Sequence, residues 1–307
     1  MNRIFVNLKR FDVPKSKGGI CQQEDPAAWV QWIVDQSVEN GLGELKGAEI
    51  CYLLPESLII PAAQRLNTYP ESRRAGLSLG CQSVFRQDVK KGVNFGAFTA
   101  NRPAAAMTTV GCAWAIIGHS EERRDKQTFL SGYDPDGGTK INRYVSAVVG
   151  QETACALEAG MGALVCVGET AEERGEGDFE QQKKRIEAVL KDQLTAGFQD
   201  AAALCTKDNL VIGYEPIWAI GPGKTPPGPD YIAFVSKLIK KLSSDILGFE
   251  PDVVYGGGLK EENAGAISGV STIDGGLVAL TRFAGEIGFY PDEFKRIVDL
   301  YLKAREA

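Results

Sequence analysis

Glu215 is the residue whose type and position best suit proton transfer. It directly follows the apolar run Leu210–Tyr214 and precedes Pro216. A carboxylate at the end of such a run is partly removed from water, which raises its pKa and makes it a stronger general base. The alternative is a structural ion pair with a lysine or arginine, which is the better interpretation of an isolated glutamate. The prediction of a catalytic base therefore depends on the other polar groups near Glu215.

His119, Lys9 and Asn7 are the groups that favour catalysis. His119 is the single histidine of the chain and follows the apolar run Trp114–Ile117. An imidazole there can polarise a carbonyl and move a proton between neighbouring oxygens. Lys9 offers positive charge where an enediolate oxygen becomes negative, and Asn7 lies two residues earlier on the same face of an extended strand. Each alone fits a packing or surface role, but with Glu215 the four predict a catalytic site.

Two glycine-rich stretches predict a lid and a phosphate site. Residues 216–227 combine an apolar flap with a flexible tip, Gly221-Pro222-Gly223, and a stiff hinge that ends in two prolines. A lid of this kind excludes water from a reactive intermediate. Gly257 and Gly258 can present backbone N–H groups to a phosphate. A surface loop without function is the alternative for residues 216–227, and a glycine triplet is weakly specific by itself.

Eight short apolar runs, each followed by an amphipathic segment of helical periodicity, must position these side chains. The runs expected to be strands are Ile4–Val6, Ile50–Leu54, Leu77–Cys81, Trp114–Ile117, Ala163–Val167, Leu210–Tyr214, Val253–Tyr255 and Leu277–Leu280. The segments expected to be helices are Pro26–Val38, Glu56–Leu66, Arg102–Val110, Val145–Ala159, Phe179–Leu194, Pro229–Leu242, Glu261–Ile267 and Pro291–Ala304.

This alternation predicts an α/β fold, a single (β/α)8 TIM barrel spanning residues 1–307. Continuously apolar strands, each followed by a helix, indicate a parallel sheet covered on its outer face. Functional side chains of such barrels sit at the carboxyl ends of the strands, where Lys9, His119 and Glu215 fall. An open, doubly wound sheet is disfavoured because no Gly-x-Gly-x-x-Gly follows the first strand. Two segments, Arg86–Asn94 and Thr128–Asn142, are expected to be inserted surface loops.

Composition limits the protein's partners and location. The net charge of −6 argues against a nucleic-acid-binding protein, and no run of about 18 apolar residues could cross a membrane. The N-terminus lacks the apolar stretch of a signal peptide. Seven scattered cysteines without a Cys-x-x-Cys pair argue against a disulfide framework or a metal cluster. We therefore expect a cytoplasmic protein with reduced thiols and no metal.

Several stretches match the motifs of one known enzyme family in that family's order. The longest is residues 214–225, Tyr-Glu-Pro-Ile-Trp-Ala-Ile-Gly-Pro-Gly-Lys-Thr, and another is residues 117–121, Ile-Gly-His-Ser-Glu. Asn7-x-Lys9, residues 166–169, residues 255–257 and residues 96–99 also fit. Together these motifs resemble the triosephosphate isomerase family over nearly the whole chain.

The resemblance implies a mechanism and an assembly. Glu215 would remove a proton next to the carbonyl of a small phosphorylated sugar and return it to the neighbouring carbon. His119 and Lys9 would stabilise the enediolate, as in the family's known use of a glutamate base and a neutral histidine. No metal or organic cofactor is implied. The family is usually a homodimer, and the loop Gln82–Thr99 would reach the partner's active site.

Departures from the family pattern cluster around the phosphate and the dimer interface. Gly258 replaces a usual serine, and Ala279 and Leu280 replace two glycines that normally approach the phosphate. Both retain their N–H groups, but each adds a Cβ that restricts close approach. Arg282, two residues further on, could supply a bidentate contact to a displaced phosphate.

These departures leave the substrate open. Leu8, Glu122 and Asn101 also replace the family's usual tryptophan, arginine and acidic residue. The first hypothesis is interconversion of glyceraldehyde 3-phosphate and dihydroxyacetone phosphate. The second is isomerisation of another small phosphorylated ketose, such as a tetrulose phosphate. The third is a barrel without catalysis, which the presence of both Glu215 and His119 disfavours.

Overall fold

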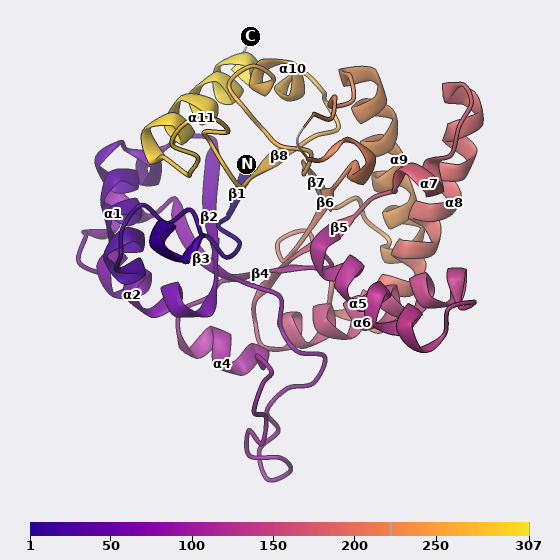
Figure 1. Ribbon diagram of the computed structural model, residues 1–307, viewed down its shortest axis with the longest axis horizontal. Helices are drawn as coiled ribbons and strands as arrows, with labels where there is room; N and C mark the ends of the chain where they lie inside the picture. Colours follow the sequence, from indigo (N-terminus) through magenta and orange to yellow (C-terminus); the bar gives the residue numbers. More distant parts are fainter. Residues whose placement is uncertain (222, 307) are drawn as a thin grey trace.

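Eight parallel strands close into a barrel in the computed structural model, which describes residues 1–221 and 223–306 (Figure 1). The strands are β1 (Asn2–Asn7), β2 (Ala48–Leu54), β3 (Leu77–Gln82), β4 (Trp114–Ile117), β5 (Gly162–Val167), β6 (Leu210–Tyr214), β7 (Asp252–Tyr255) and β8 (Gly275–Val278). Each strand pairs with its neighbours in sequence, and β1 also pairs with β8, where Ile4 lies opposite Gly276. The prediction of a (β/α)8 TIM barrel is confirmed.

Helices surround the barrel on its outer side (Figure 1). They are α1 (Pro26–Glu39), α2 (Glu56–Leu66), α3 (Glu71–Arg74), α4 (Ala104–Thr109), α5 (Ser120–Tyr133), α6 (Gly138–Glu158), α7 (Ala171–Arg174), α8 (Phe179–Phe198), α9 (Pro229–Leu247), α10 (Ala264–Ser268) and α11 (Pro291–Glu306). None of the described helices is both long and apolar enough to cross a membrane.

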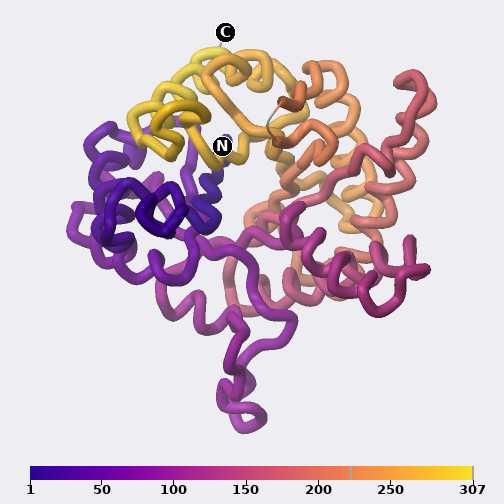
Figure 2. Tube along the Cα trace, in the orientation of Figure 1, coloured from indigo at the N-terminus to yellow at the C-terminus, as the bar shows by residue number. Residues whose placement is uncertain are grey.

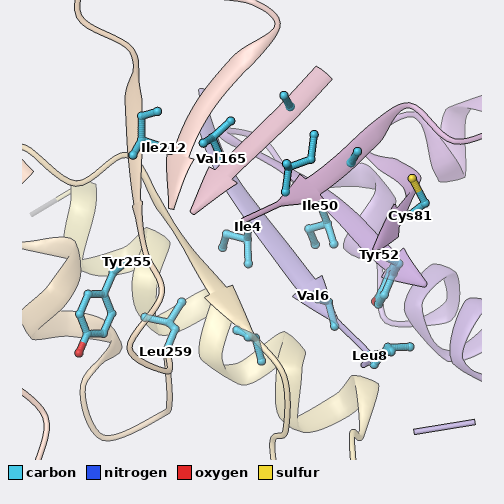
Figure 3. Close-up of a cluster of buried hydrophobic side chains, with 14 of the residues drawn as sticks. Ile4, Val6, Leu8, Ile50, Tyr52, Cys81, Val165, Ile212, Tyr255 and Leu259 are labelled. Atoms are coloured by element: carbon cyan, nitrogen blue, oxygen red, sulfur yellow. The ribbon is translucent and has the colours of Figure 1, made fainter. Parts of the chain in front are cut away.

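The strands are buried on both faces, which explains why they are continuously apolar. In β1, Ile4 and Val6 belong to the large cluster that packs between strands and helices (Figure 3). Phe5, between them, belongs to a second cluster with residues such as Leu164 and Val211. Because alternate side chains of a strand point to opposite faces, the two clusters lie on opposite faces of the sheet. The rigid sheet then fixes the positions of the residues that follow each strand.

Two sequence predictions are wrong in detail. Residues 128–142 were expected to form a surface loop, but α5 and α6 cover most of them and leave only residues 134–137 as a connection. The eighth strand was expected at Leu277–Leu280, but it ends at Val278 because β1 pairs with residues 275–278. Ala279 and Leu280 therefore lie in the loop after the strand.

The loop between β3 and α4 projects from the body of the protein, as both the ribbon and the Cα trace show (Figures 1 and 2). It contains the inserted segment Arg86–Asn94, which has neither helix nor strand, as predicted. Val93 and Phe95 near its tip are 72% and 81% exposed. Exposed apolar side chains of this size on a projecting loop are typical of an interaction surface.

Candidate active site

His119 and Glu215 meet at the carboxyl ends of β4 and β6. The Nε2 atom of His119 lies 3.3 Å from Oε1 of Glu215. Glu215 is 2% exposed, and its carboxylate accepts hydrogen bonds from Ser120 N at 2.8 Å and from Ser120 Oγ at 2.9 Å. The carboxylate is therefore buried, and Ser120 donates a hydrogen bond to each of its two oxygens.

The position of His119 at the start of α5 determines which of its nitrogens carries the proton. His119 is the N-cap of this helix, and its Nδ1 accepts a hydrogen bond from Glu121 N at 3.2 Å. An imidazole nitrogen that accepts a hydrogen bond carries no proton, so in the neutral ring the proton is on Nε2. Nε2 faces Glu215, and it is the nitrogen that can donate to a substrate oxygen.

A tight turn at Gly118 holds His119 in place. Gly118 has φ +71°, a left-handed conformation that a residue with a Cβ rarely adopts. Its N–H donates to Glu122 Oε2 at 2.7 Å, and its carbonyl accepts from Arg123 Nε at 2.8 Å. Glu122, where the family pattern has an arginine, thus braces the backbone next to the histidine.

Lys9 and Asn7 lie on the same side of the site. Lys9 has φ +40°, and its N–H donates to Asn7 Oδ1 at 3.0 Å. Gln82 Nε2 donates to Asn7 Oδ1 and to the Lys9 carbonyl, so that this side chain holds the unusual turn. The Lys9 ammonium contacts Glu121 Oε1 at 2.7 Å, and His119 Nδ1 lies 3.8 Å from the same carboxylate. Lys9 holds the pKa of Glu121 below its usual value despite partial burial.

A cavity of about 200 Å³ opens between these groups. Its lining residues are Asn7, Lys9, Arg10, Gln82, Ser83, Arg102, Ile116, His119, Glu121 and Glu122. Three of the four predicted catalytic residues therefore line one cavity. Glu215 does not line it, because Ser120 holds its carboxylate to one side.

The chain's similarity to known proteins agrees with this geometry. The sequence model of the family described as triosephosphate isomerase matches residues 52–298. The chain belongs to the triosephosphate isomerase family. It is 33% identical over 227 residues to the triosephosphate isomerase of Oleidesulfovibrio alaskensis, covering 73% of this chain and 76% of that protein.

Two further similarities cover more of the chain. The triosephosphate isomerase of Halorhodospira halophila is 30% identical over 270 residues, 87% of this chain and 91% of that protein. The crystal structure of triosephosphate isomerase from Bartonella henselae superposes with a TM-score of 0.68 and covers 98% of this chain and 99% of that one. At 23% identity this second likeness shows the fold alone. The family resemblance inferred from the sequence motifs is confirmed.

The segment that resembles the family's lid is anchored at its start by Glu169. Glu169 Oε1 accepts hydrogen bonds from Trp218 Nε1 at 2.8 Å, Tyr214 at 3.0 Å and Tyr231 at 2.8 Å. Burial raises the pKa of Glu169 above its usual value, against the effect of these donors. The Arg174 guanidinium lies 3.8 Å from the centre of the Trp218 ring. Of the expected lid tip, Pro222 lies outside the described residues.

The expected phosphate-binding residues lie apart from the cavity. Gly257, Gly258, Ala279 and Leu280 follow β7 and β8 on the same rim, but none of them lines the cavity. Gly221, in the lid, does not line it either. Their role in binding the phosphate stays a prediction.

Arg282 is paired with a carboxylate of α11. Its Nε donates to Glu293 Oε1 at 2.9 Å, and its Nη2 contacts the same oxygen. The guanidinium also lies 3.9 Å from the centre of the Tyr290 ring. Glu293 therefore occupies the Nε–Nη2 edge of the guanidinium, and a phosphate contact from Arg282 would use its remaining N–H groups. That contact stays a prediction.

Sequence reasoning missed the supporting roles of Ser120, Gln82 and Glu121. Ser120 and Glu121 lie within the quoted motif at residues 117–121, so their position beside His119 was a usable signal. Gln82 was seen only as the start of a loop. Its contact with Asn7 joins β3 to β1, and no sequence spacing reveals such a contact.

Proposed function

We propose that this protein is an aldose–ketose isomerase that interconverts glyceraldehyde 3-phosphate and dihydroxyacetone phosphate through an enediolate. The observation that carries the proposal is the 3.3 Å approach of His119 Nε2 to Glu215 Oε1 beside the Lys9 cavity. A base, a neutral donor and a fixed cation are the groups that proton transfer between adjacent carbons requires. Membership of the triosephosphate isomerase family supports the same substrate class.

The roles follow from the chemistry of each group. Glu215 removes a proton from the carbon next to the substrate carbonyl and returns it to the neighbouring carbon. His119 donates from Nε2 to the oxygen that becomes negative, and Lys9 stabilises the same charge. Asn7 accepts the Lys9 N–H and keeps the lysine at the site. No step needs a metal or an organic cofactor.

Glu215 must leave Ser120 before it can act. Two hydrogen bonds from Ser120 hold the carboxylate away from the cavity. When the lid closes over a bound substrate, the Glu215 carboxylate leaves Ser120 and approaches the substrate carbon. Closure also excludes water from the enediolate. Residues 217–220 and Gly221 supply the apolar flap and part of the tip that this motion requires.

We further propose that the protein acts as a homodimer. The projecting loop Gln82–Thr99 carries exposed Val93 and Phe95, and its first residues, Gln82 and Ser83, line the cavity beside Lys9. We expect the partner's loop to cover this cavity. We also propose a cytoplasmic location, since the seven buried free cysteines suit a reducing compartment.

A substrate comparison tests the function. The purified protein is assayed with glyceraldehyde 3-phosphate and with tetrulose phosphates under identical conditions. We expect kcat/KM to be higher for the triose phosphate by at least ~10-fold, since a poorly fitting methylene-sized group costs about 1–3 kcal/mol. A preference for a tetrulose phosphate would favour the second hypothesis, for which the altered residues 279 and 280 are the structural reason. No turnover of any phosphorylated ketose would overturn the proposal.

A further inference from the structure

The loop after β7 lies directly against the proposed base and the start of the lid, and the loop after β8 contacts it through Phe283 and Lys260. A Cβ added to Gly256 would lie 2.9 Å from Glu215 Cγ, and one added to Gly257 would lie 2.9 Å from Pro216 Cγ. Both approaches are too short for a side chain at these positions. An anion held by these loops would therefore lie next to the reacting atoms.

Four backbone donors of these loops are unused. The N–H groups of Gly257, Gly258, Ala279 and Leu280 donate to no acceptor within residues 1–221 and 223–306. Unpaired N–H groups in two adjacent loops are a typical setting for a bound phosphate oxygen. Backbone donors supply only partial charge, however, and the Cβ atoms of Ala279 and Leu280 limit how closely an anion can approach them.

Lys260 brings a full positive charge to this place. Its Nζ lies 4.0 Å from the centre of the Phe283 ring, which belongs to the loop after β8. Among the described residues other than Gly258 and its two chain neighbours, its Cε is the one atom within 4 Å of where a Cβ on Gly258 would be, at 3.9 Å. Lys260 thus bridges the two loops that hold the unused N–H groups, and its stem lies over a position that has no side chain.

Lys260 differs from the other cations of this region in having no carboxylate partner. Arg282 is paired with Glu293, Lys15 with Glu286 and Arg296 with Glu261. In the part of the chain that the structure describes, no carboxylate oxygen lies within 4.0 Å of the Lys260 ammonium. The ring of Phe283 orients the ammonium without using up its N–H donors, because a cation is attracted to the face of an aromatic ring.

We propose that Lys260 binds the phosphate group of the substrate and sets the enzyme's preference for phosphorylated substrates. The proposal rests on the proposed isomerase function and names a residue of the same site. The Cβ atoms of Ala279 and Leu280 keep the backbone N–H groups from closely approaching the phosphate. The positive charge of Lys260 neutralises the phosphate instead. Gly258 leaves the space through which the Lys260 side chain reaches the phosphate.

Binding of inorganic phosphate tests the proposal without relying on turnover. Isothermal titration compares the wild type with K260M, K260R and the control K207M, in which an exposed lysine outside this region is replaced. We expect K260M to weaken phosphate binding at least ~10-fold, the effect of losing one charge-assisted hydrogen bond. K260R should recover most of the affinity, and K207M should match the wild type. Equal thermal unfolding of all four proteins excludes a folding defect.

Steady-state kinetics on glyceraldehyde 3-phosphate then separate this proposal from the proposed function. We expect K260M to raise KM at least ~10-fold with a smaller change in kcat. Wild-type turnover with unchanged phosphate affinity and unchanged KM in K260M would overturn the role of Lys260 and leave the isomerase function standing. Weaker phosphate binding by K260M in a protein without isomerase activity would support the anion site and overturn the function.

Discussion

Two hydrogen bonds from one residue, Ser120, hold the Glu215 carboxylate beside His119. The backbone donor belongs to the first turn of α5, where free N–H groups and the helix dipole favour a negative charge. The same helix start fixes the proton of His119 on Nε2. One short stretch of chain therefore controls both the base and the neutral donor of the proposed reaction.

Replacement of the carboxylate tests the role of Glu215. In E215Q the amide oxygen can still accept from Ser120, so that the fold should be kept while the base is lost. We expect kcat to fall at least ~10²-fold, the typical contribution of a general base. Turnover of glyceraldehyde 3-phosphate is measured beside E187Q, which changes an exposed glutamate on α8 and should behave as the wild type. A folded E215Q with near wild-type kcat would exclude Glu215 as the base.

The sequence predicted those residues of the candidate site that follow a strand. Lys9, His119 and Glu215 each follow an apolar run, and a barrel brings all strand ends to one rim. The pairing of Arg282 with Glu293 was not predictable, because it depends on how α11 packs against the loop after β8. Local sequence gives the position of a charged group along the chain but not the partner that neutralises it.

At the scale of elements, α5 and α6 show where turn signals mislead. The Asp, Pro and Gly residues at 132–138 correctly indicate a turn, and the structure has a connection at 134–137. The sequence prediction extended this turn signal to the flanking residues 128–131 and 139–142, which are helical. They continue α5 and α6, which pack against each other. The eighth strand was misplaced for a related reason, since pairing with β1 decides its end.

A buried charge cluster joins these two helices. Lys126 on α5 contacts Glu152 on α6 at 2.7 Å and Glu122 at 2.5 Å. Burial, followed by the neighbouring charge of Glu122, raises the pKa of Glu152 to about 8. Lys126 and its other hydrogen-bonding partners hold the pKa of Glu122 below its usual value against the effect of burial. Glu122 and Glu152 therefore share Lys126, and Glu152 is the carboxyl group that keeps its proton near neutral pH.

Stability should depend on pH through Glu152. Its folded-state pKa lies above the unfolded value of 4.5, so that the folded protein binds more protons between these values. The free energy of unfolding should therefore fall as pH rises from about 5 to about 8. In E152Q this fall should be smaller by at least ~1.4 kcal/mol, the equivalent of one pKa unit.

Urea denaturation at about pH 5.5 and about pH 8.5 measures the difference. The control is E158Q, an exposed glutamate at the end of the same helix, which should keep the wild-type pH dependence. Equal pH dependence in E152Q and the wild type would show that Glu152 is ionised in the folded protein throughout this range.

At the scale of the whole molecule, the loop between β3 and α4 stands out because it projects from the barrel (Figure 2). The loop between β3 and α4 extends away from the body (Figure 2) and carries Val93 and Phe95 in contact with solvent. Residue periodicity predicted the closed barrel because every strand is buried on both faces. The same periodicity could not predict the direction of this loop, because in the proposed dimer that direction depends on contacts with the second subunit.

Charged substitutions at the loop tip test the dimer. In the double variant V93D/F95D, two carboxylates would have to be buried against a partner, at a cost well above the ~2 kcal/mol of a single interface hot spot. We expect the wild type to sediment as a dimer at micromolar concentration and the variant to sediment as a monomer with at least ~10-fold lower kcat, because the cavity beside Lys9 loses the partner's loop. The control Y133D changes an aromatic residue that is 92% exposed at the end of α5, and it should remain dimeric and active. A V93D/F95D protein that sediments as the wild type does would place the interface elsewhere, and a fully active monomer would show that the site is complete within one chain.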